Sequence, residues 1–205
     1  MNLDPYFLLA VLVVITIHEF SHGLVADYLG DPTARLRGRL TLNPMAHLDP
    51  IGALAFIFFG FGWAKPVPID PYNLQDPKRD SMLISLAGPA SNLLTALILA
   101  GIVRLSFLNH LTVFSNIFTP FFFQVMFVSV ILAVFNLIPI HPLDGGKILV
   151  GLLPDHLARD VDDFLNRYGM IVLLLLLVTG GFGTIIGPLV KLIMSLLLPS
   201  ASFLI

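Results

Sequence analysis

The chain has 205 residues, of which 57% are hydrophobic and only 12% are charged, and its formal net charge is −2. Soluble domains carry roughly 25% charged residues, and here no Asp, Glu, Lys or Arg stands between Arg104 and Asp144. Such a chain cannot cover a surface in water, so it predicts an integral membrane protein. The lack of cysteine excludes disulfides, thiolate metal sites and a cysteine nucleophile. The sequence has no basic stripe of the kind that binds nucleic acid.

Three long apolar stretches predict membrane-spanning helices, at residues 6–29, 82–103 and 120–143. The first would be about 36 Å long at a helical rise of roughly 1.5 Å per residue. Residues 51–62 are apolar but too short to cross alone, which predicts a re-entrant or interfacial segment. Residues from about 168 to 205 predict about two further transmembrane helices, interrupted by glycines and a proline.

The connection between the first two spans predicts a small membrane-associated β element. Residues 35–42 alternate charged or polar side chains with apolar ones, which is the period of a strand. Residues 65–71, KPVPIDP, are expected to be extended because each proline biases its predecessor away from the helix. The predicted fold is therefore an all-α polytopic membrane protein with this β element in its first loop.

The distribution of basic residues predicts the orientation in the membrane. Of the eleven Lys and Arg, six lie between the first two spans, and the connection at 107–119 has none. By the positive-inside rule, the N-terminus is outside, and the first and third spans both end on the cytoplasmic side.

An HExxH sequence, formed by His18, Glu19 and His22, lies inside the first span. Histidines four residues apart project from nearly the same helix face and can bind one ion. Glu19, rotated by about 100°, can then act as a general base. Ionisable side chains within a membrane are costly and by default functional. We favour a metal site. The alternatives are a proton relay and a hydrogen-bond cluster that packs helices together.

A catalytic zinc has three protein ligands and one open position, so a third ligand must lie at the depth of His22. Asp144 stands at the cytoplasmic end of the third span, and the predicted topology brings it to that depth. We therefore expect one zinc ion per chain, held by two neutral imidazoles and one carboxylate. Asp27 and Asp31 follow His22 toward solvent and are expected to be helix-end charges.

Two polar side chains precede Asp144 in sequence. Asn136 can hold a ligand or a substrate carbonyl through its amide, and the alternative is a hydrogen bond between helices. His141 can be a fourth ligand, but beside prolines at an interface a solvated side chain is the simpler expectation.

HEFSH at 18–22, together with an NxxPxxxxDG pattern at 136–145, resembles the site-2 protease family of intramembrane zinc metalloproteases. WAKPVPID at 63–70 and LAGPASN at 86–92 are also similar to that family, especially to its compact prokaryotic members, which lack a PDZ-like insert. The resemblance extends from about residue 8 to 150.

The resemblance implies a single membrane metalloprotease domain over residues 1–205, with a three-span catalytic core at about 6–150 and C-terminal helices at about 168–205. Its implied location is the inner or plasma membrane of a prokaryotic cell. The implied zinc ligands are His18, His22 and Asp144, with Glu19 activating water. It further implies that the substrate region is lined by Gly88, Asn92 and Asn136.

The expected reaction is hydrolysis of a peptide bond within or beside a transmembrane segment of a membrane protein substrate, with the active site toward the cytoplasm. Pro66 and Pro68 alternate with Val67 and Ile69, so the backbone amides of Val67 and Ile69 fall on one edge of the extended segment. We expect this edge to pair with unwound substrate, and the alternative is a plain loop or an internal strand.

Two other function classes use the same residues. One is a non-proteolytic metal or ion carrier, which the apolar residues 7–15 disfavour because they offer no outward polar path. The other is a zinc membrane hydrolase acting on a different substrate class, such as a lipid, which the paired motifs disfavour.

Overall fold

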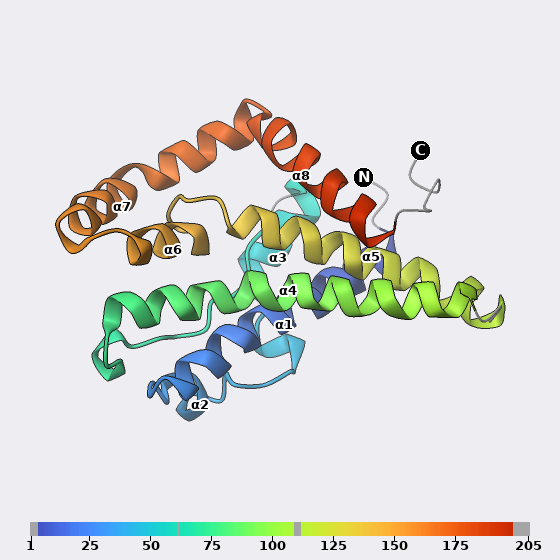
Figure 1. Cartoon of the computed structure of the whole chain (residues 1–205), viewed down its shortest axis with the longest axis horizontal. Coiled ribbons are helices and arrows are strands. Elements are labelled where there is room, and N and C mark those ends of the chain that lie inside the picture. Colours follow the sequence, from blue (N-terminus) through green and yellow to red (C-terminus); the bar gives the residue numbers. More distant parts are fainter. Residues whose placement is uncertain (1–3, 61, 109–111, 199–205) are drawn as a thin grey trace.

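The computed structural model describes residues 4–60, 62–108 and 112–198 (Figure 1). Three long helices lie side by side, namely α1 (Pro5–Tyr28), α4 (Pro77–Leu108) and α5 (Thr112–Asn136). Each contains a stretch long and apolar enough to cross a membrane, at Pro5–Tyr28, Pro77–Ser106 and Phe118–Asn136. A candidate span thus lies at each of the three predicted positions, as an integral membrane protein requires, although the third helix ends at Asn136 and not near residue 143 as predicted.

Small side chains let these three helices approach closely. Ala10 and Val14 of α1 are fully buried against Val125 and Val128 of α5. A second apolar cluster joins α4 and α5 to the C-terminal helix α8 (Gly181–Leu197). Helices that pack in lipid use such small residues because their backbones must come close to gain van der Waals contact.

Shorter elements connect the spans. They are α2 (Thr33–Leu36), η1 (Pro44–Ala46), α3 (Pro50–Phe59), η2 (Pro71–Asn73) and α6 (Asp144–Leu152). The Asp49 carboxylate starts α3 by accepting hydrogen bonds from the Ile51 and Gly52 amides at 2.9 and 2.8 Å. With ten residues, α3 is too short to cross a membrane, as the sequence predicts.

The predicted β element is wrong. Across the residues that the structure describes there is no β-strand, and one isolated bridge joins Leu48 to Ala64. The alternating sequence at 35–42 instead begins in α2 and continues through a turn at Gly38, whose φ is +64°. The alternation of side chains was a true feature of the sequence, but a strand also needs a partner strand for its backbone.

The extended segment 65–70 satisfies its backbone in other ways. Its Lys65 amide donates to the carbonyl of His47 at 2.9 Å, and its Lys65 carbonyl accepts from the Arg39 guanidinium at 2.8 Å. Hydrogen bonds to loops and side chains thus replace the expected sheet.

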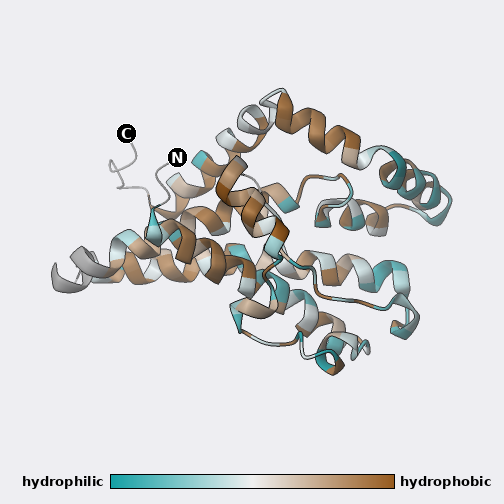
Figure 2. Ribbon diagram, turned by 180° about the vertical axis from the view of Figure 1, so that it is seen from behind, coloured by the Kyte–Doolittle hydropathy of each residue, from teal (hydrophilic) through white to brown (hydrophobic). Residues whose placement is uncertain are grey.

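The C-terminal prediction is also corrected. Helices α7 (Asp155–Val178) and α8 meet at a bend of 80°, and by length and composition the pair amounts to at most one further span, broken or re-entrant. Figure 2 shows why: the first half of α7 is hydrophilic and only its second half is apolar. Gly180, at φ +72°, then turns the chain. Residues 199–205 of the predicted region lie outside the described residues.

Candidate metal centre

The structure brings the three predicted ligands together. His18 and His22 project from α1, and Asp144 is the first residue of α6. The two histidine Nε2 atoms are 3.0 Å apart, and the Asp144 Oδ2 lies 3.2 Å from one and 3.4 Å from the other. Both imidazoles are buried, and the carboxyl group is partly exposed.

The loop before α6 sets the position of Asp144. Helix α5 ends at Asn136, and Pro139 and Pro142 stand in the following loop. A Cβ on Gly145 would lie 2.5 Å from the carbonyl oxygen of Leu137, so only glycine lets the start of α6 fold back on the end of α5.

The donor set fits a zinc ion. Tetrahedral ligands at roughly 2.0–2.1 Å from zinc are about 3.3 Å apart, close to the three separations observed here. The Asp144 Oδ2 is buried and receives no hydrogen bond from the described residues. The His22 Nδ1 lies 2.6 Å from the carbonyl oxygen of Ile84 and must therefore donate to it. The His22 Nε2 then presents a lone pair beside a carboxylate, and this arrangement favours the binding of a cation.

Helix α4 passes directly behind the histidines, and Gly88 makes this possible. A Cβ at that position would lie 2.5 Å from both the His18 Cε1 and the His22 Nε2. The structure places Gly88 against the imidazole rings, and its implied place in the substrate region stays a prediction. Any side chain there would enter the space that the histidines and a metal ion need.

Asn92, one turn after Gly88, contacts the first histidine. Its Nδ2 atom is 3.0 Å from the His18 Nδ1, and the residue has no exposed surface. Asn92 therefore lies behind His18, and its implied place in the substrate region stays a prediction. Sequence reasoning missed the matching contact of Ile84, which uses a backbone carbonyl and has no side-chain signal.

Glu19 is held by the segment that follows α3. The Val67 amide donates to the Glu19 Oε2 at 2.9 Å. Gly23, one turn further along α1, lets this segment approach, since a Cβ there would be 3.3 Å from the Val67 Cγ1. The Val67 amide is thus bonded within the chain, which corrects the expectation of a free amide at this position. Ile69 is partly buried against the end of α1, and its pairing with substrate stays a prediction.

Asn136 forms no hydrogen bond with the three ligands in the part of the chain that the structure describes. Its Nδ2 donates to the Leu132 carbonyl of its own helix at 3.0 Å, so the alternative, a hydrogen bond between helices, is not observed among the described residues. The side chain is half-buried at the end of α5. A role for Asn136 toward a ligand or a substrate therefore stays a prediction.

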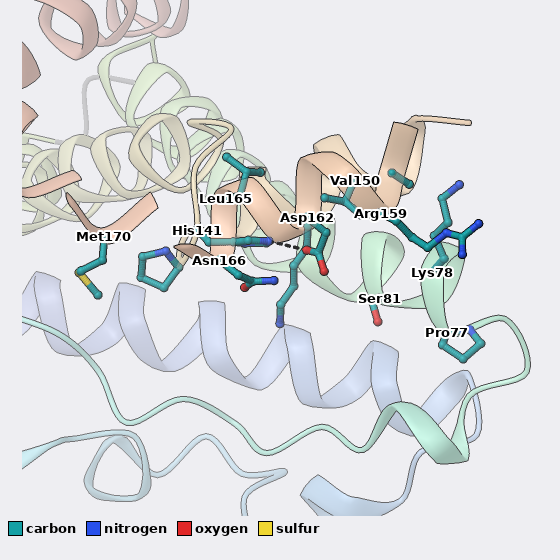
Figure 3. Close-up of a pocket in the computed structure, with 13 residues that line it drawn as sticks. Pro77, Lys78, Ser81, His141, Val150, Arg159, Asp162, Leu165, Asn166 and Met170 are labelled. Carbon is teal, nitrogen blue, oxygen red and sulfur yellow. Dashed lines mark hydrogen bonds and ion pairs between the residues drawn. The ribbon is translucent and has the colours of Figure 1, made fainter. Parts of the chain in front are cut away.

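His141 differs from both expectations. Its Nε2 lies 2.8 Å from the Asp162 Oδ1 of α7, and its side chain is 12% exposed (Figure 3). Among the described residues the group of possible ligands does not include it. The pair lines a cavity of about 750 Å³ between α4, α6 and α7, together with basic side chains such as Lys147 and Arg159. His141 therefore ties the loop before Asp144 to α7.

Asp31 is a buried anchor, although a helix-end charge was expected. It has no exposed surface and accepts hydrogen bonds from Thr33, from the Asp70 amide at 2.7 Å and from the Asn73 side chain at 2.8 Å. Burial would raise the pKa of Asp31, but these hydrogen bonds outweigh it and hold the pKa below its usual value. Asp27, by contrast, forms an ion pair with Arg35 at 2.9 Å, as expected near a helix end.

An HExxH helix and a carboxylate from a later element, meeting among membrane-spanning helices, define a membrane-embedded zinc metalloprotease. The pattern of peptidase family M50 matches residues 105–177, which include Asp144. The chain is 38% identical over 182 residues to "Putative zinc metalloprotease YwhC" of Bacillus subtilis, covering 87% of this chain and 83% of that protein. These matches show that the chain belongs to peptidase family M50.

Two mycobacterial relatives support the same assignment. The chain is 33% identical over 181 residues to "Putative zinc metalloprotease Rip2" of Mycolicibacterium smegmatis, covering 82% of this chain and 64% of that protein. It is 32% identical over 141 residues to the protein of that name from Mycobacterium tuberculosis, covering 65% of this chain and 52% of that protein. No solved structure matches the chain.

Proposed function

We propose that the chain is an intramembrane endopeptidase that hydrolyses peptide bonds within or next to transmembrane segments of membrane proteins. The observation that carries the proposal is the meeting of His18, His22 and Asp144, with ligand atoms within 4.8 Å of one another. The two histidines lie inside the first predicted span, and Asp144 follows the third. Membership of a zinc metalloprotease family supports peptide hydrolysis as the reaction class.

His18, His22 and Asp144 would hold one zinc ion, which when bound supplies a Lewis acid for the scissile carbonyl and lowers the pKa of water. The chain's own contribution is to keep the two imidazoles in the tautomer that leaves Nε2 free. For His22, the carbonyl of Ile84 performs this role at 2.6 Å.

Glu19 is the proposed general base, and it is the only glutamate of the chain. The Val67 amide holds its Oε2 atom at 2.9 Å, while Oε1 receives no hydrogen bond from the residues that the structure describes. In the proposed mechanism, Oε1 accepts a proton from the attacking water and passes it to the leaving amine. The hydrogen bond from the Val67 amide fixes the orientation of the carboxyl group and leaves Oε1 for this step.

The proposed orientation places the site toward the cytoplasm, on the strength of the bias of Lys and Arg. Water would then enter from the cytoplasmic side, and the substrate helix would come from the bilayer. A peptide bond inside a helix is protected by its own hydrogen bonds, so the substrate must become extended locally. Pairing at the Ile69 edge of the 65–70 segment is the proposed means.

The proposal is tested by Glu19→Gln, assayed with a tagged single-span substrate expressed in the same cells. The variant is expected to retain one zinc per chain and to lose cleavage by a factor of about 10² or more, because it cannot accept the proton. Asp27→Asn is the matched control, since it removes a partly exposed carboxylate two turns further along α1, which pairs with Arg35. Full turnover by Glu19→Gln would contradict the mechanism.

A further inference from the structure

We infer that Asn92 is a positioning residue of the metal centre, whose side-chain oxygen accepts the Nδ1–H of His18 and thereby leaves the His18 Nε2 free to bind metal. The inference rests on the proposed function, because it concerns the tautomer that a zinc ligand needs. It assigns to Asn92 a role that differs from the substrate-lining one implied by the resemblance.

The contact is close and excluded from solvent. Asn92 is fully buried, His18 is 5% exposed, and 3.0 Å separates the amide nitrogen from the His18 Nδ1. The two ends of a side-chain amide have nearly the same shape, so hydrogen-bond partners decide which end faces a neighbour. The other end of the Asn92 amide has no hydrogen-bond partner in the described part of the chain. No second hydrogen bond therefore holds the amide nitrogen toward His18.

The two orientations have opposite consequences for the metal centre. If the amide nitrogen faces His18, Nδ1 must accept, and a neutral ring carries its proton on Nε2, where it points at the other two ligands. If the amide oxygen faces His18, Nδ1 donates and Nε2 presents a lone pair to the ion. A zinc-binding His18 therefore requires the oxygen of Asn92.

The second histidine shows the same arrangement. The His22 Nδ1 lies 2.6 Å from the backbone oxygen of Ile84, which can only accept. Ile84, Gly88 and Asn92 are spaced by four residues and share one face of α4. That face thus offers an acceptor to each histidine and, between them, a glycine that lets the rings pack closely.

The inference is tested by measuring the zinc dissociation constant of purified protein in detergent, by competition with a chromogenic chelator. Asn92→Leu, which has no acceptor, is expected to weaken zinc binding about 10- to 100-fold. Asn92→Asp keeps the shape and can accept, so it is expected to bind zinc within about tenfold of the wild type. Ser91→Ala is the matched control on the same helix, because within the described ranges that hydroxyl bonds only to the Gly88 carbonyl.

Two results would overturn the inference: wild-type zinc affinity in Asn92→Leu, or a loss in Asn92→Asp as large as in Asn92→Leu. Elution as a single species and unchanged helical circular dichroism show that the variants are folded. If the wild type itself bound no zinc, the proposed function would fail together with the inference. Zinc binding that is indifferent to position 92 would remove the inference alone.

A second measurement needs no variant of Asn92. Nitrogen-15 NMR of histidine-labelled, metal-free wild type reports which ring nitrogen carries the proton, and the His18 signal is assigned by its loss in His18→Gln. We expect His18 to be protonated at Nδ1 before zinc is added, because Asn92 sets the tautomer in advance. A neutral ring protonated at Nε2 would show that the amide donates, and would refute the inference.

Discussion

A methyl group at position 88 would collide with both histidine rings. In Gly88→Ala the new Cβ would lie 2.5 Å from the His18 Cε1 and from the His22 Nε2, about 1 Å short of ordinary contact, which begins at 3.4 Å. Neither ring can retreat freely, because Asn92 and the Ile84 carbonyl contact their Nδ1 atoms. The rings or α4 must therefore shift by about 1 Å.

The structure sets the size of the expected effect. Overpacking of this kind costs roughly 1–3 kcal/mol of stability, and a displacement of about 1 Å at a reacting centre can reduce the rate about 10²-fold. Gly88→Ala should therefore bind zinc at least about tenfold more weakly and lose most cleavage, while remaining folded.

Gly101→Ala provides the control in the same helix. A Cβ at Gly101 meets nothing within 4 Å, so the added methyl group should leave zinc binding unchanged. Replacing a glycine inside a helix can even stabilise it, by up to about 1 kcal/mol. The assay is zinc titration of both variants, with cleavage of a tagged single-span substrate in parallel. Wild-type zinc affinity and cleavage in Gly88→Ala would refute the close packing of α4 on the histidines.

Two further predictions concern the acidic residues. Asp144→Ala should lower the zinc content from one ion per chain to nearly none, as measured by elemental analysis of purified protein. Asp155→Ala, which removes an exposed carboxylate, should keep the zinc. One zinc per chain in Asp144→Ala would exclude Asp144 as a ligand. Asp31→Asn should lower stability at pH 7 by roughly 1.5–3 kcal/mol, because hydrogen bonds to a charged acceptor are lost. The pKa of Asp31 is depressed in the folded protein. The Asp31 carboxylate therefore stabilises the fold fully at a pH above its ordinary pKa of about 4, and this stabilisation is lost as the pH falls through the pKa of the folded state. Melting temperatures measured from pH 7 to pH 3 should therefore fall more steeply for the wild type than for Asp31→Asn, and parallel curves would contradict the assignment.

The sequence by itself determined the features that depend on local spacing and on hydrophobicity. A helix satisfies its own backbone in lipid, so apolar runs predict spans without knowledge of the neighbours. The spacing of four between His18 and His22 places them on one helix face in any environment. Asp144 could be proposed as their partner because the bias of basic residues set the direction of each span.

Hydropathy did not reveal how the C-terminal helices are arranged. The apolar content of residues 168–198 is real, but composition does not report the 80° bend that makes α7 and α8 at most one span. The expected β element was wrong for a related reason. Alternation describes the side chains, whereas a strand exists only if another backbone is placed to pair with it.

Only the tertiary structure decided what surrounds the metal ligands. The contact of Asn92 with His18, the carbonyl of Ile84 at His22 and the Val67 amide at Glu19 join residues 48 to 74 positions apart. Such contacts depend on which face of α4 meets α1 and on where the 65–70 segment crosses α1. A backbone carbonyl or amide is present at almost every residue, so its use at one site has no signature in the sequence.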